Sequence, residues 1–136
     1  MKNVVILGDG IAGVTAAIYT ARADLKPLIL TGPESGGQLT YTTDVENFPG
    51  FPEGVQGPEL VQNGKEQAKR FGAEFQNGVA TNLVKQDGHY ELKTDNKTLQ
   101  TKTLIVATGA SARWLGLDDE EKYQGNGVST CATCDG

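Results

Sequence analysis

The sequence predicts an α/β fold with a parallel central sheet and a small antiparallel β-meander, and three observations lead to this expectation. Short apolar runs occupy residues 4–7, 27–31 and 103–107, as is typical of parallel strands buried on both faces. A glycine turn and a helical pattern separate the first two runs. Turn signals break residues 73–102 into short, hairpin-like strands. This order of elements is typical of a Rossmann-like fold.

Residues 1–31 form a complete βαβ unit in this interpretation. Residues 4–7 supply the first strand, which ends at Gly8. Asp24 and Pro27 mark the end of the helix, and the second strand follows. Because a helix connects the two strands, we expect them to be parallel and adjacent. The apolar residues of that helix recur at helical spacing, at Val14, Ala17, Ile18 and Ala21.

A long loop and a second helix come next. Residues 32–57 are rich in Gly, Pro, Thr and Asn and have no sustained period. A structureless loop of this length in a compact domain is usually functional, so we expect it to lie over a ligand. The second helix opens at Gly57-Pro58 and runs to Phe71, with Gly64 weakening its middle.

The meander and a third central strand complete the expected sheet. Asp87-Gly88 and Asp95-Asn96 look like the hairpin turns of the meander. Residues 103–107 then return to the central sheet and end at Thr108-Gly109. Residues 111–127 change to a charged stretch punctuated by Gly, which is typical of a linker into a second domain.

Composition and charge exclude several classes of protein. The chain has 12 Lys and Arg against 17 Asp and Glu, a net charge of −5, and no basic stripe interleaved with aromatics, so we expect no nucleic-acid partner. The apolar run near the N-terminus is too short for a signal peptide or a membrane span. We therefore expect a soluble, cytoplasmic protein without a membrane partner. Two cysteines cannot staple a secreted domain.

The glycine turn carries the first chemical motif. Gly8, Gly10 and Gly13 stand directly after a strand and open a helix, where a dinucleotide fingerprint can receive a pyrophosphate on backbone N–H groups. The alternative is a turn that only packs the helix on the strand. The acid that usually grips the ribose is replaced by Thr31, with Glu34 three residues later. Glu34 either takes the ribose role from the loop or is simply solvated.

The two cysteines carry the second motif. Cys131 and Cys134 have the spacing of a redox disulfide, in which one thiolate attacks and the other resolves the mixed disulfide. The same spacing is half of a zinc site, but His89 is the one further soft ligand in the sequence, so we expect no metal. Two inert thiols are the third reading. Asp135 follows directly and is placed either to exchange a proton with the thiols or to form a turn.

Five segments taken together resemble the low-molecular-weight bacterial thioredoxin reductases, in their N-terminal portion. This family is a class of pyridine nucleotide-disulfide oxidoreductases. The order and spacing of the segments agree over the whole chain, and Cys-Ala-Thr-Cys-Asp-Gly after Ala-Thr-Gly is more specific than any glycine pattern alone. The segments are residues 8–13, 36–39, 46–50, 107–110 and 131–136.

The resemblance implies cofactors, a partner and residue roles. NADPH would reduce FAD, FAD would reduce the Cys131–Cys134 disulfide, and the dithiol would reduce oxidised thioredoxin. Cys134 would face the flavin, Cys131 would attack the thioredoxin disulfide, and Asp135 would handle the proton. Thr at position 31 also occurs in the family. The FAD site would be drawn from the glycine turn, the loop after the second strand, the meander and the end of the third strand: Gly8, Gly10, Ile11, Ala12, Gly13, Thr31, Gly32, Pro33, Glu34, Ser35, Gly36, Gly37, Gln38, Leu39, Asn47, Val79, Ala80, Ala107, Thr108 and Gly109.

The resemblance also implies an incomplete chain. Residues 1–111 would be the first part of an FAD-binding domain without its return segment, and residues 112–136 would be a linker and the start of an NADPH-binding domain. A full-length parent would be a homodimer. Alternatives are a related flavin enzyme serving a peroxiredoxin, a stand-alone flavin-binding module, and a chain that does not fold stably alone because return strands are missing.

Two departures from the family bear on these expectations. Asp9-Gly10-Ile11 replaces a small residue, Gly and Pro, and Asp9 would place a carboxylate near an anionic pyrophosphate. We expect this to weaken FAD binding. Gly64 replaces an apolar residue in the second helix, at a cost of up to about 1 kcal/mol in helix propensity together with any lost packing.

Overall fold

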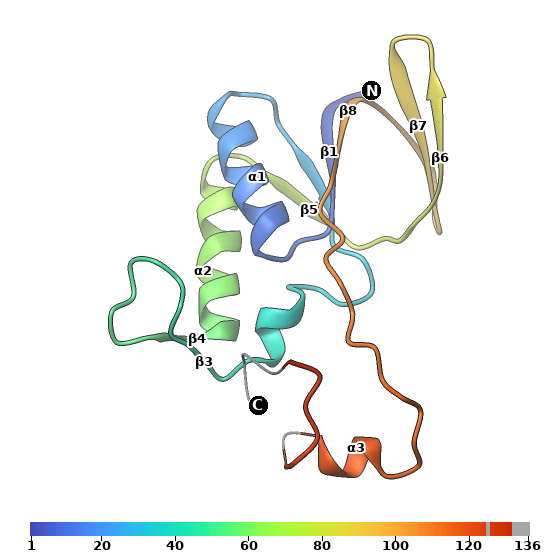
Figure 1. Ribbon diagram of the computed structural model, residues 1–136. Coiled ribbons are helices and arrows are strands. Elements are labelled where there is room, and N and C mark those ends of the chain that lie inside the picture. Colours follow the sequence, from blue (N-terminus) through green and yellow to red (C-terminus); the bar gives the residue numbers. More distant parts are fainter. Residues whose placement is uncertain (125, 132–136) are drawn as a thin grey trace.

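The computed structural model describes residues 1–124 and 126–131, and its centre is a six-stranded sheet (Figure 1). The strand order is β5-β2-β1-β8-β7-β6. In chain order these strands are β1 (Lys2–Leu7), β2 (Leu28–Leu30), β5 (Glu74–Gln76), β6 (Ala80–Gln86), β7 (His89–Thr94) and β8 (Thr98–Val106). A separate small sheet pairs β3 (Asp44–Val45) with β4 (Val55–Gln56) in antiparallel fashion.

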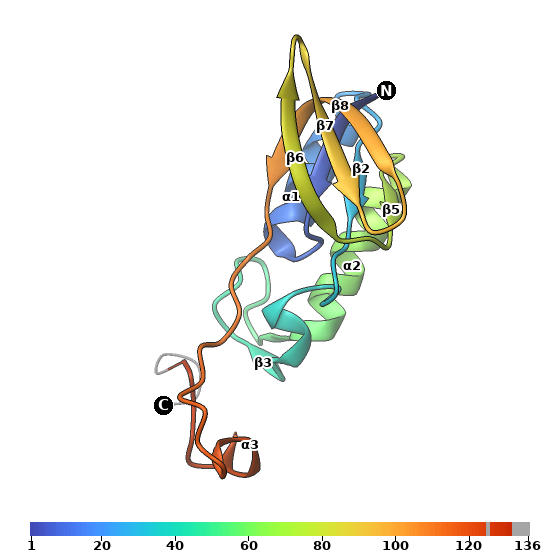
Figure 2. The ribbon, with the colours of Figure 1, turned by 90° about the vertical axis from the view of Figure 1, so that its right-hand side faces the viewer.

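The central strands β1 and β2 are covered on both faces, whereas β8 is less buried than its apolar run predicts, with Leu104 and Ile105 partly buried and Val106 66% exposed. Helices α1 (Ile11–Arg22) and α2 (Gly57–Arg70) pack against each other on one face of the sheet (Figure 1). The antiparallel strands β6, β7 and β8 extend from the central strands and cover the opposite face (Figure 2). Successive side chains of a strand point to opposite faces, so each central strand needs apolar residues throughout. The helix-side core includes Val4, Ile6, Ile29, Ala17 and Ala68, and the meander-side core includes Val5, Leu28, Leu30 and Leu92.

The predicted α/β, Rossmann-like class is confirmed. Strands β1 and β2 are parallel with Val5 opposite Leu28, as the βαβ interpretation requires. Strand β8 returns to the other side of β1, also parallel, with Leu104 opposite Val5. The meander of β6, β7 and β8 is antiparallel. Helix α2 begins at Gly57, as expected, and ends one residue before Phe71.

Three details differ from the expectation. Residues 32–57 are not structureless, because they contain the 3-10 helix η1 (Gln38–Tyr41) and the small β3–β4 sheet. Strand β5 is not part of the meander, since it pairs parallel with β2 and belongs to the central sheet. Strand β8 combines the last meander strand and the third central strand: one part pairs antiparallel with β7 and the rest pairs parallel with β1.

Gly64 also behaves differently from the expectation. A Cβ placed on Gly64 would lie 2.9 Å from Cγ1 of Val14, which is closer than a side chain tolerates. Val14 is 1% exposed and belongs to α1, so the glycine lets the two helices approach closely. Its helix-propensity cost remains, but no packing is lost at this position.

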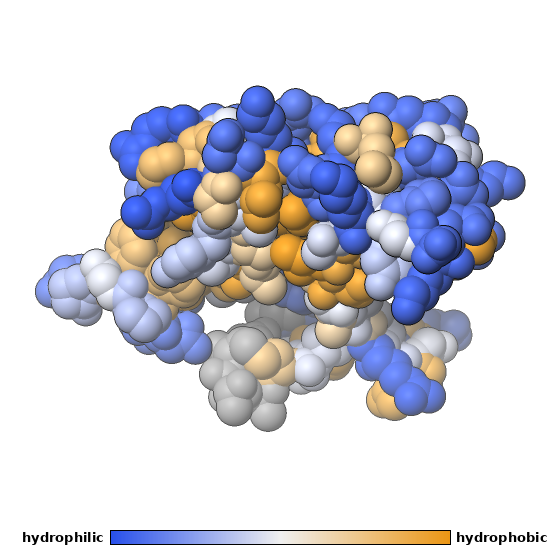
Figure 3. Space-filling view, turned by 90° about the horizontal axis from the view of Figure 1, so that it is seen from above, coloured by the Kyte–Doolittle hydropathy of each residue, from blue (hydrophilic) through white to orange (hydrophobic). Residues whose placement is uncertain are grey.

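After β8 the chain leaves the sheet. Residues 107–124 and 126–131 extend away from the central strands, and the short helix α3 (Glu120–Tyr123) lies in the first of these segments (Figures 1 and 2). Seen from above, hydrophobic side chains gather toward the middle of the surface and hydrophilic ones surround them (Figure 3). In the described part of the chain, no helix has the length and apolar character needed to cross a membrane.

Candidate functional site

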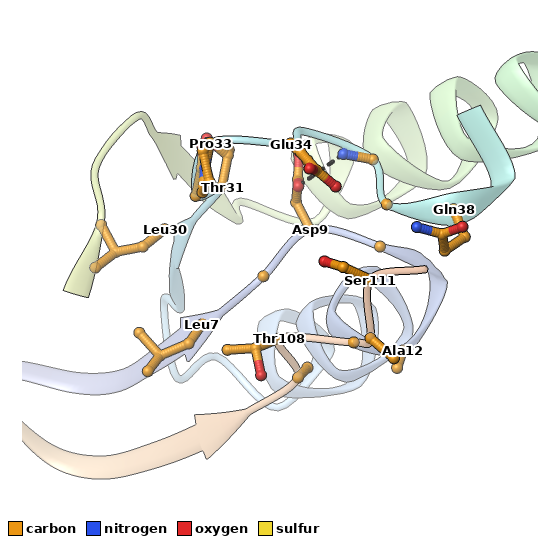
Figure 4. Close-up of a pocket in the computed structure, with 18 of the residues that line it drawn as sticks. Leu7, Asp9, Ala12, Leu30, Thr31, Pro33, Glu34, Gln38, Thr108 and Ser111 are labelled. Carbon is orange, nitrogen blue, oxygen red and sulfur yellow. Dashed lines mark hydrogen bonds between the residues drawn. The ribbon is translucent and has the colours of Figure 1, made fainter. Parts of the chain in front are cut away.

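A pocket of about 430 Å³ lies beyond the carboxyl ends of β1, β2 and β8. This is where ligands bind in open α/β sheets, and the volume is within the range of roughly 300–1,000 Å³ usual for ligand sites. Two walls face each other across it (Figure 4). Leu7, Ala12 and Thr108 lie on one side, and Leu30, Thr31 and Pro33 lie on the other.

The turn between β1 and α1 contains glycines with two different roles. Gly8 has φ +97°, and a Cβ on it would lie 2.2 Å from the carbonyl oxygen of Ala107. A Cβ on Gly13 would lie 1.9 Å from the carbonyl oxygen of Gly8. These two glycines are therefore needed for the helix to pack on the strand. Gly10 is different, because a Cβ there would have its nearest neighbours at 3.7 Å and 3.9 Å, on the backbones of Gly36 and Gly37.

The N-terminus of α1 opens into this pocket. Gly10 is the N-cap residue, and among the described residues no side chain caps it by a hydrogen bond. Ile11 and Ala12, the first helical residues, line the pocket. Uncapped N–H groups at a helix N-terminus form a binding site for anions such as phosphate.

Asp9 is buried and paired. Its side chain is 1% exposed, and Oδ2 lies 2.6 Å from Nζ of Lys65. Oδ1 accepts a hydrogen bond from the backbone N–H of Gly36 at 2.8 Å (Figure 4), and Oδ2 accepts one from the Ser35 hydroxyl at 2.6 Å. The Lys65 ammonium therefore offsets the charge of the carboxylate expected to repel a pyrophosphate, and the expected weakening of FAD binding stays a prediction.

Opposing effects act on the pKa of Asp9. Burial is the largest single effect and raises the pKa, since it penalises the charged form. Hydrogen bonds from Lys65, Ser35 and Gly36, together with the positive charge of Lys65, lower it. The net result is a pKa below the ordinary value of 3.8, so Asp9 is ionised at neutral pH.

The loop after β2 forms the second wall. Thr31 is 8% exposed, and its hydroxyl donates a hydrogen bond to Oδ1 of Asn77 at 3.1 Å. Glu34 is exposed and lines the pocket. Gly36 and Gly37 have φ +92° and +69°, the left-handed region that favours glycine. The Cβ position of Gly37 lies 3.5 Å from the Cα of Gly10, so the loop and the turn meet backbone to backbone.

Most of the predicted cofactor residues meet in this one pocket. In the described chain, all of them line it except Gly13, Ser35 and Asn47. Gly13 packs on Gly8, Ser35 bonds to Asp9, and Asn47 is exposed between β3 and β4. The prediction missed six lining residues, most of which adjoin predicted ones at strand ends and could have been found on that basis: Leu7, Asp9, Leu30, Gly78, Ala110 and Ser111.

The predicted redox motif is described only at its first residue. Cys131 is disulfide-bonded, and its backbone N–H donates to the Ser129 hydroxyl at 3.0 Å. Cys134 and Asp135 lie outside the described residues. In residues 1–124 and 126–131, no three His, Cys, Asp or Glu side chains are grouped so that they could hold a metal ion. The roles expected of Cys131, Cys134 and Asp135 stay predictions.

The structure is a Rossmann-like α/β domain with a pocket at the carboxyl ends of its central strands. Residues 2–136 match the pyridine nucleotide-disulphide oxidoreductase family, and the chain belongs to that family. It is 51% identical over 134 residues to the thioredoxin reductase of Coxiella burnetii, covering 98% of this chain and 42% of that relative. The predicted resemblance to bacterial thioredoxin reductases is thereby confirmed.

Two further proteins illustrate the range of the matches. The solved structure of thioredoxin reductase from Streptococcus pyogenes superposes with a TM-score of 0.90 at 38% identity, covering 99% of this chain and 44% of that one. A glucosaminate ammonia-lyase of Pseudomonas fluorescens is 51% identical over 137 residues, covering 99% of this chain and 42% of its own. The chain thus spans less than half the length of these relatives.

Proposed function

We propose that this chain supplies the FAD site and the redox disulfide of an NADPH-dependent thioredoxin reductase that acts in the cytoplasm as a homodimer. Residues 1–111 belong to the FAD-binding domain, and residues 112–136 lead into the NADPH-binding domain. The observation that carries the proposal is the pocket at the strand ends, where the uncapped N-terminus of α1 and the backbone of Gly36 and Gly37 face each other.

The residues present fit FAD. A pyrophosphate needs N–H donors and close backbone approach, which Gly10, Ile11 and Ala12 provide at the start of α1. Gly10 and Gly37 leave the space that a Cβ would otherwise take. Glu34, exposed at the rim, is placed to accept hydrogen bonds from ribose hydroxyls. The paired Asp9 adds no net charge.

The remaining residues would position the flavin end. The other lining segments are apolar or backbone-rich, as ligand pockets usually are. They come from η1 and the residue before it, the start of β6 and the end of β8: Gly37, Gln38, Leu39, Val79, Ala80, Ala107, Thr108 and Gly109. Bound FAD would supply two-electron transfer from NADPH to a disulfide.

The disulfide carries the electrons onward in this proposal. Two electrons and two protons convert the Cys131–Cys134 disulfide to two thiols, and Asp135 takes part in the proton transfer. The Cys131 thiolate then attacks the disulfide of thioredoxin and forms a mixed disulfide. Cys134 attacks the Cys131 sulfur of that mixed disulfide and releases thioredoxin. The products are reduced thioredoxin and the regenerated Cys131–Cys134 disulfide, so atoms and electrons balance.

A second candidate function comes from the ammonia-lyase relative, whose identity to this chain equals that of the Coxiella thioredoxin reductase. An ammonia-lyase eliminates ammonia without net electron transfer, so it needs no redox disulfide. The Cys-x-x-Cys spacing therefore favours the reductase. A flavin reductase that serves a peroxiredoxin differs only in its partner protein and shares the same site.

The test is an anaerobic reduction of the chain after loading with FAD. We expect a bound-flavin absorption spectrum, bleaching by dithionite, and the appearance of two thiols per chain in a thiol titration. The variant Cys131→Ser should load FAD equally and release fewer thiols. A folded chain that takes up no flavin would contradict the proposal, and a flavin-loaded chain whose thiols never react with thioredoxin would favour the second candidate.

A further inference from the structure

Three chain segments converge on the carboxylate of Asp9. Asp9 belongs to the turn between β1 and α1, Ser35 and Gly36 belong to the loop after β2, and Lys65 belongs to α2. The two carboxylate oxygens receive three donors at 2.6–2.8 Å. Lys65 closes the cluster, because its Nζ also donates to the Ser35 hydroxyl at 2.9 Å.

We propose that Asp9, Ser35 and Lys65 form an ionic clasp that positions the Gly36–Gly37 backbone as a wall of the pocket, and that Lys65 neutralises the Asp9 carboxylate so that the glycine turn can accept an anionic ligand although it contains an acid. The second half of this statement rests on the proposed FAD function, and the first half does not. Ser35 and Lys65 are positioning residues, since they do not line the pocket within the described chain, whereas Asp9 both lines the pocket and holds Gly36.

The first argument concerns how Gly36 is held. A Cβ on Gly36 would lie 2.5 Å from Cγ2 of Thr40 and 3.1 Å from Cγ1 of Val61, so its backbone is enclosed by η1 and α2. Its N–H donates to Asp9 on the remaining side. Gly36 is buried, and a buried N–H that loses its acceptor is strongly disfavoured. The position of the loop is therefore fixed by Asp9.

The second argument concerns charge. Asp9 precedes the N-cap residue of α1, where a carboxylate and a pyrophosphate would compete for the same positive helix end. A buried carboxylate without a partner is unfavourable in itself and would repel the ligand. Lys65, whose side chain is 15% exposed, removes both effects through the 2.6 Å ion pair. The acid and the lysine thus act as a matched pair.

The rigidity of the lysine supports this role. Its neighbour Gly64 lies against Val14 of α1, so this part of α2 is closely packed against the helix that starts at the pocket. The backbone of Lys65 is therefore anchored, and only its side chain must be ordered to reach Asp9. An ion pair between anchored segments loses less entropy than one between mobile surface chains.

The charge half is tested by a double-mutant cycle on FAD affinity, read by quenching of flavin fluorescence. We expect Lys65→Met to weaken FAD binding by roughly tenfold or more, because it leaves the Asp9 charge unpaired. Asp9→Asn should weaken it less, and the double variant Asp9→Asn/Lys65→Met should return to within roughly threefold of the unmodified chain. Lys65→Arg should bind nearly normally. Lys69→Met, which removes an exposed lysine one turn further along α2, is the matched control.

The positioning half is tested without any cofactor, by hydrogen exchange at the Gly36 amide. We expect protection in the unmodified chain and at least roughly tenfold faster exchange in Asp9→Ala, with α1 amides unchanged. The inference would be overturned if hydrogen exchange at Gly36 were unchanged in Asp9→Ala. It would also be overturned if Lys65→Met bound FAD as tightly as the unmodified chain, or if the double variant bound FAD no more tightly than Lys65→Met. Failure of the unmodified chain to bind FAD would instead refute the proposed function, and the exchange result would still decide whether the clasp holds the loop.

Discussion

Replacing Gly13 by Ala tests whether the glycines of the turn have different roles, with Gly8 and Gly13 needed for packing and Gly10 facing the ligand. A Cβ at position 13 would stand 1.9 Å from the carbonyl oxygen of Gly8 and 2.9 Å from its carbonyl carbon. Real Cβ atoms almost never approach within 3.0 Å, so α1 must move by about 1.1 Å relative to β1. Both neighbours of this contact belong to the backbone, so no side chain can rotate away to relieve it.

The expected magnitude follows from this overlap. Forcing one extra carbon into a packed interior costs about 1–3 kcal/mol, and a backbone contact belongs at the upper end. A loss of about 3 kcal/mol lowers the melting temperature of a domain of this size by about 10 °C. The assay is urea unfolding followed by circular dichroism, with the slope checked against that of the unmodified chain.

Gly10→Ala is the matched control, since it is the same chemical change three residues earlier. Its Cβ would have 3.7 Å to the nearest atom, so stability should fall by less than about 1 kcal/mol, the usual range for changes at a helix N-cap. FAD affinity should fall, because this methyl group projects toward the Gly36–Gly37 wall. If Gly13→Ala proved as stable as the unmodified chain, the assignment of roles to the two glycines would be refuted.

Three further predictions concern other parts of the chain. Because the pKa of Asp9 in the folded chain lies below 3.8, the stabilisation of the fold by the Asp9 carboxylate should be fully present above about pH 3.8 and lost as the pH falls through that folded pKa. The unfolding free energies of the unmodified chain and Asp9→Asn should therefore differ by a constant amount from about pH 5 to 8 and converge in acid. A gap that widened in acid would contradict this sign. Cys131→Ser should leave the FAD dissociation constant unchanged, since Cys131 is not a lining residue of the described pocket, and a tenfold change would place it at the site. Glu120→Gln should speed hydrogen exchange at Gly116 and leave FAD binding the same. The reason is that the Glu120 carboxylate accepts hydrogen bonds from the N–H groups of Leu115, Gly116 and Leu117 at 2.6–3.0 Å, and these hydrogen bonds also lower the pKa of Glu120. Unchanged exchange at Gly116 would mean that this turn holds its shape without the carboxylate.

The parts of the fold that follow from local pattern could be predicted from the sequence. Residues 4–7 are apolar throughout because β1 lies between the helices and the meander, and Leu104 and Ile105 of β8 are apolar because they pack, partly buried, against the two cores. Gly8 and Gly13 mark the turn because their neighbours leave no room for a side chain. Strand β5 could not be assigned, since three residues at a sheet edge carry too little pattern to distinguish a central strand from a meander strand.

The parts that depend on distant segments could not be predicted. Asp9 and Lys65 belong to different elements, so the sequence shows an acid in a pyrophosphate-binding turn but not the cation that neutralises it. Gly64 reads as a defect in an isolated helix and as a close-packing residue once Val14 is opposite it. In both cases a tertiary contact that the local sequence does not show decides the consequence of the residue.

The most direct test of the central claim is an equilibrium titration of the purified chain with FAD, followed by flavin fluorescence and repeated in the presence of ADP. The account predicts saturable binding of one FAD per chain, competition by ADP for the site at the N-terminus of α1, and loss of binding in Gly10→Val but not in Leu83→Ala on the exposed part of β6. A chain that is folded by circular dichroism yet shows no saturable binding, or binds FAD equally well in Gly10→Val, would contradict it.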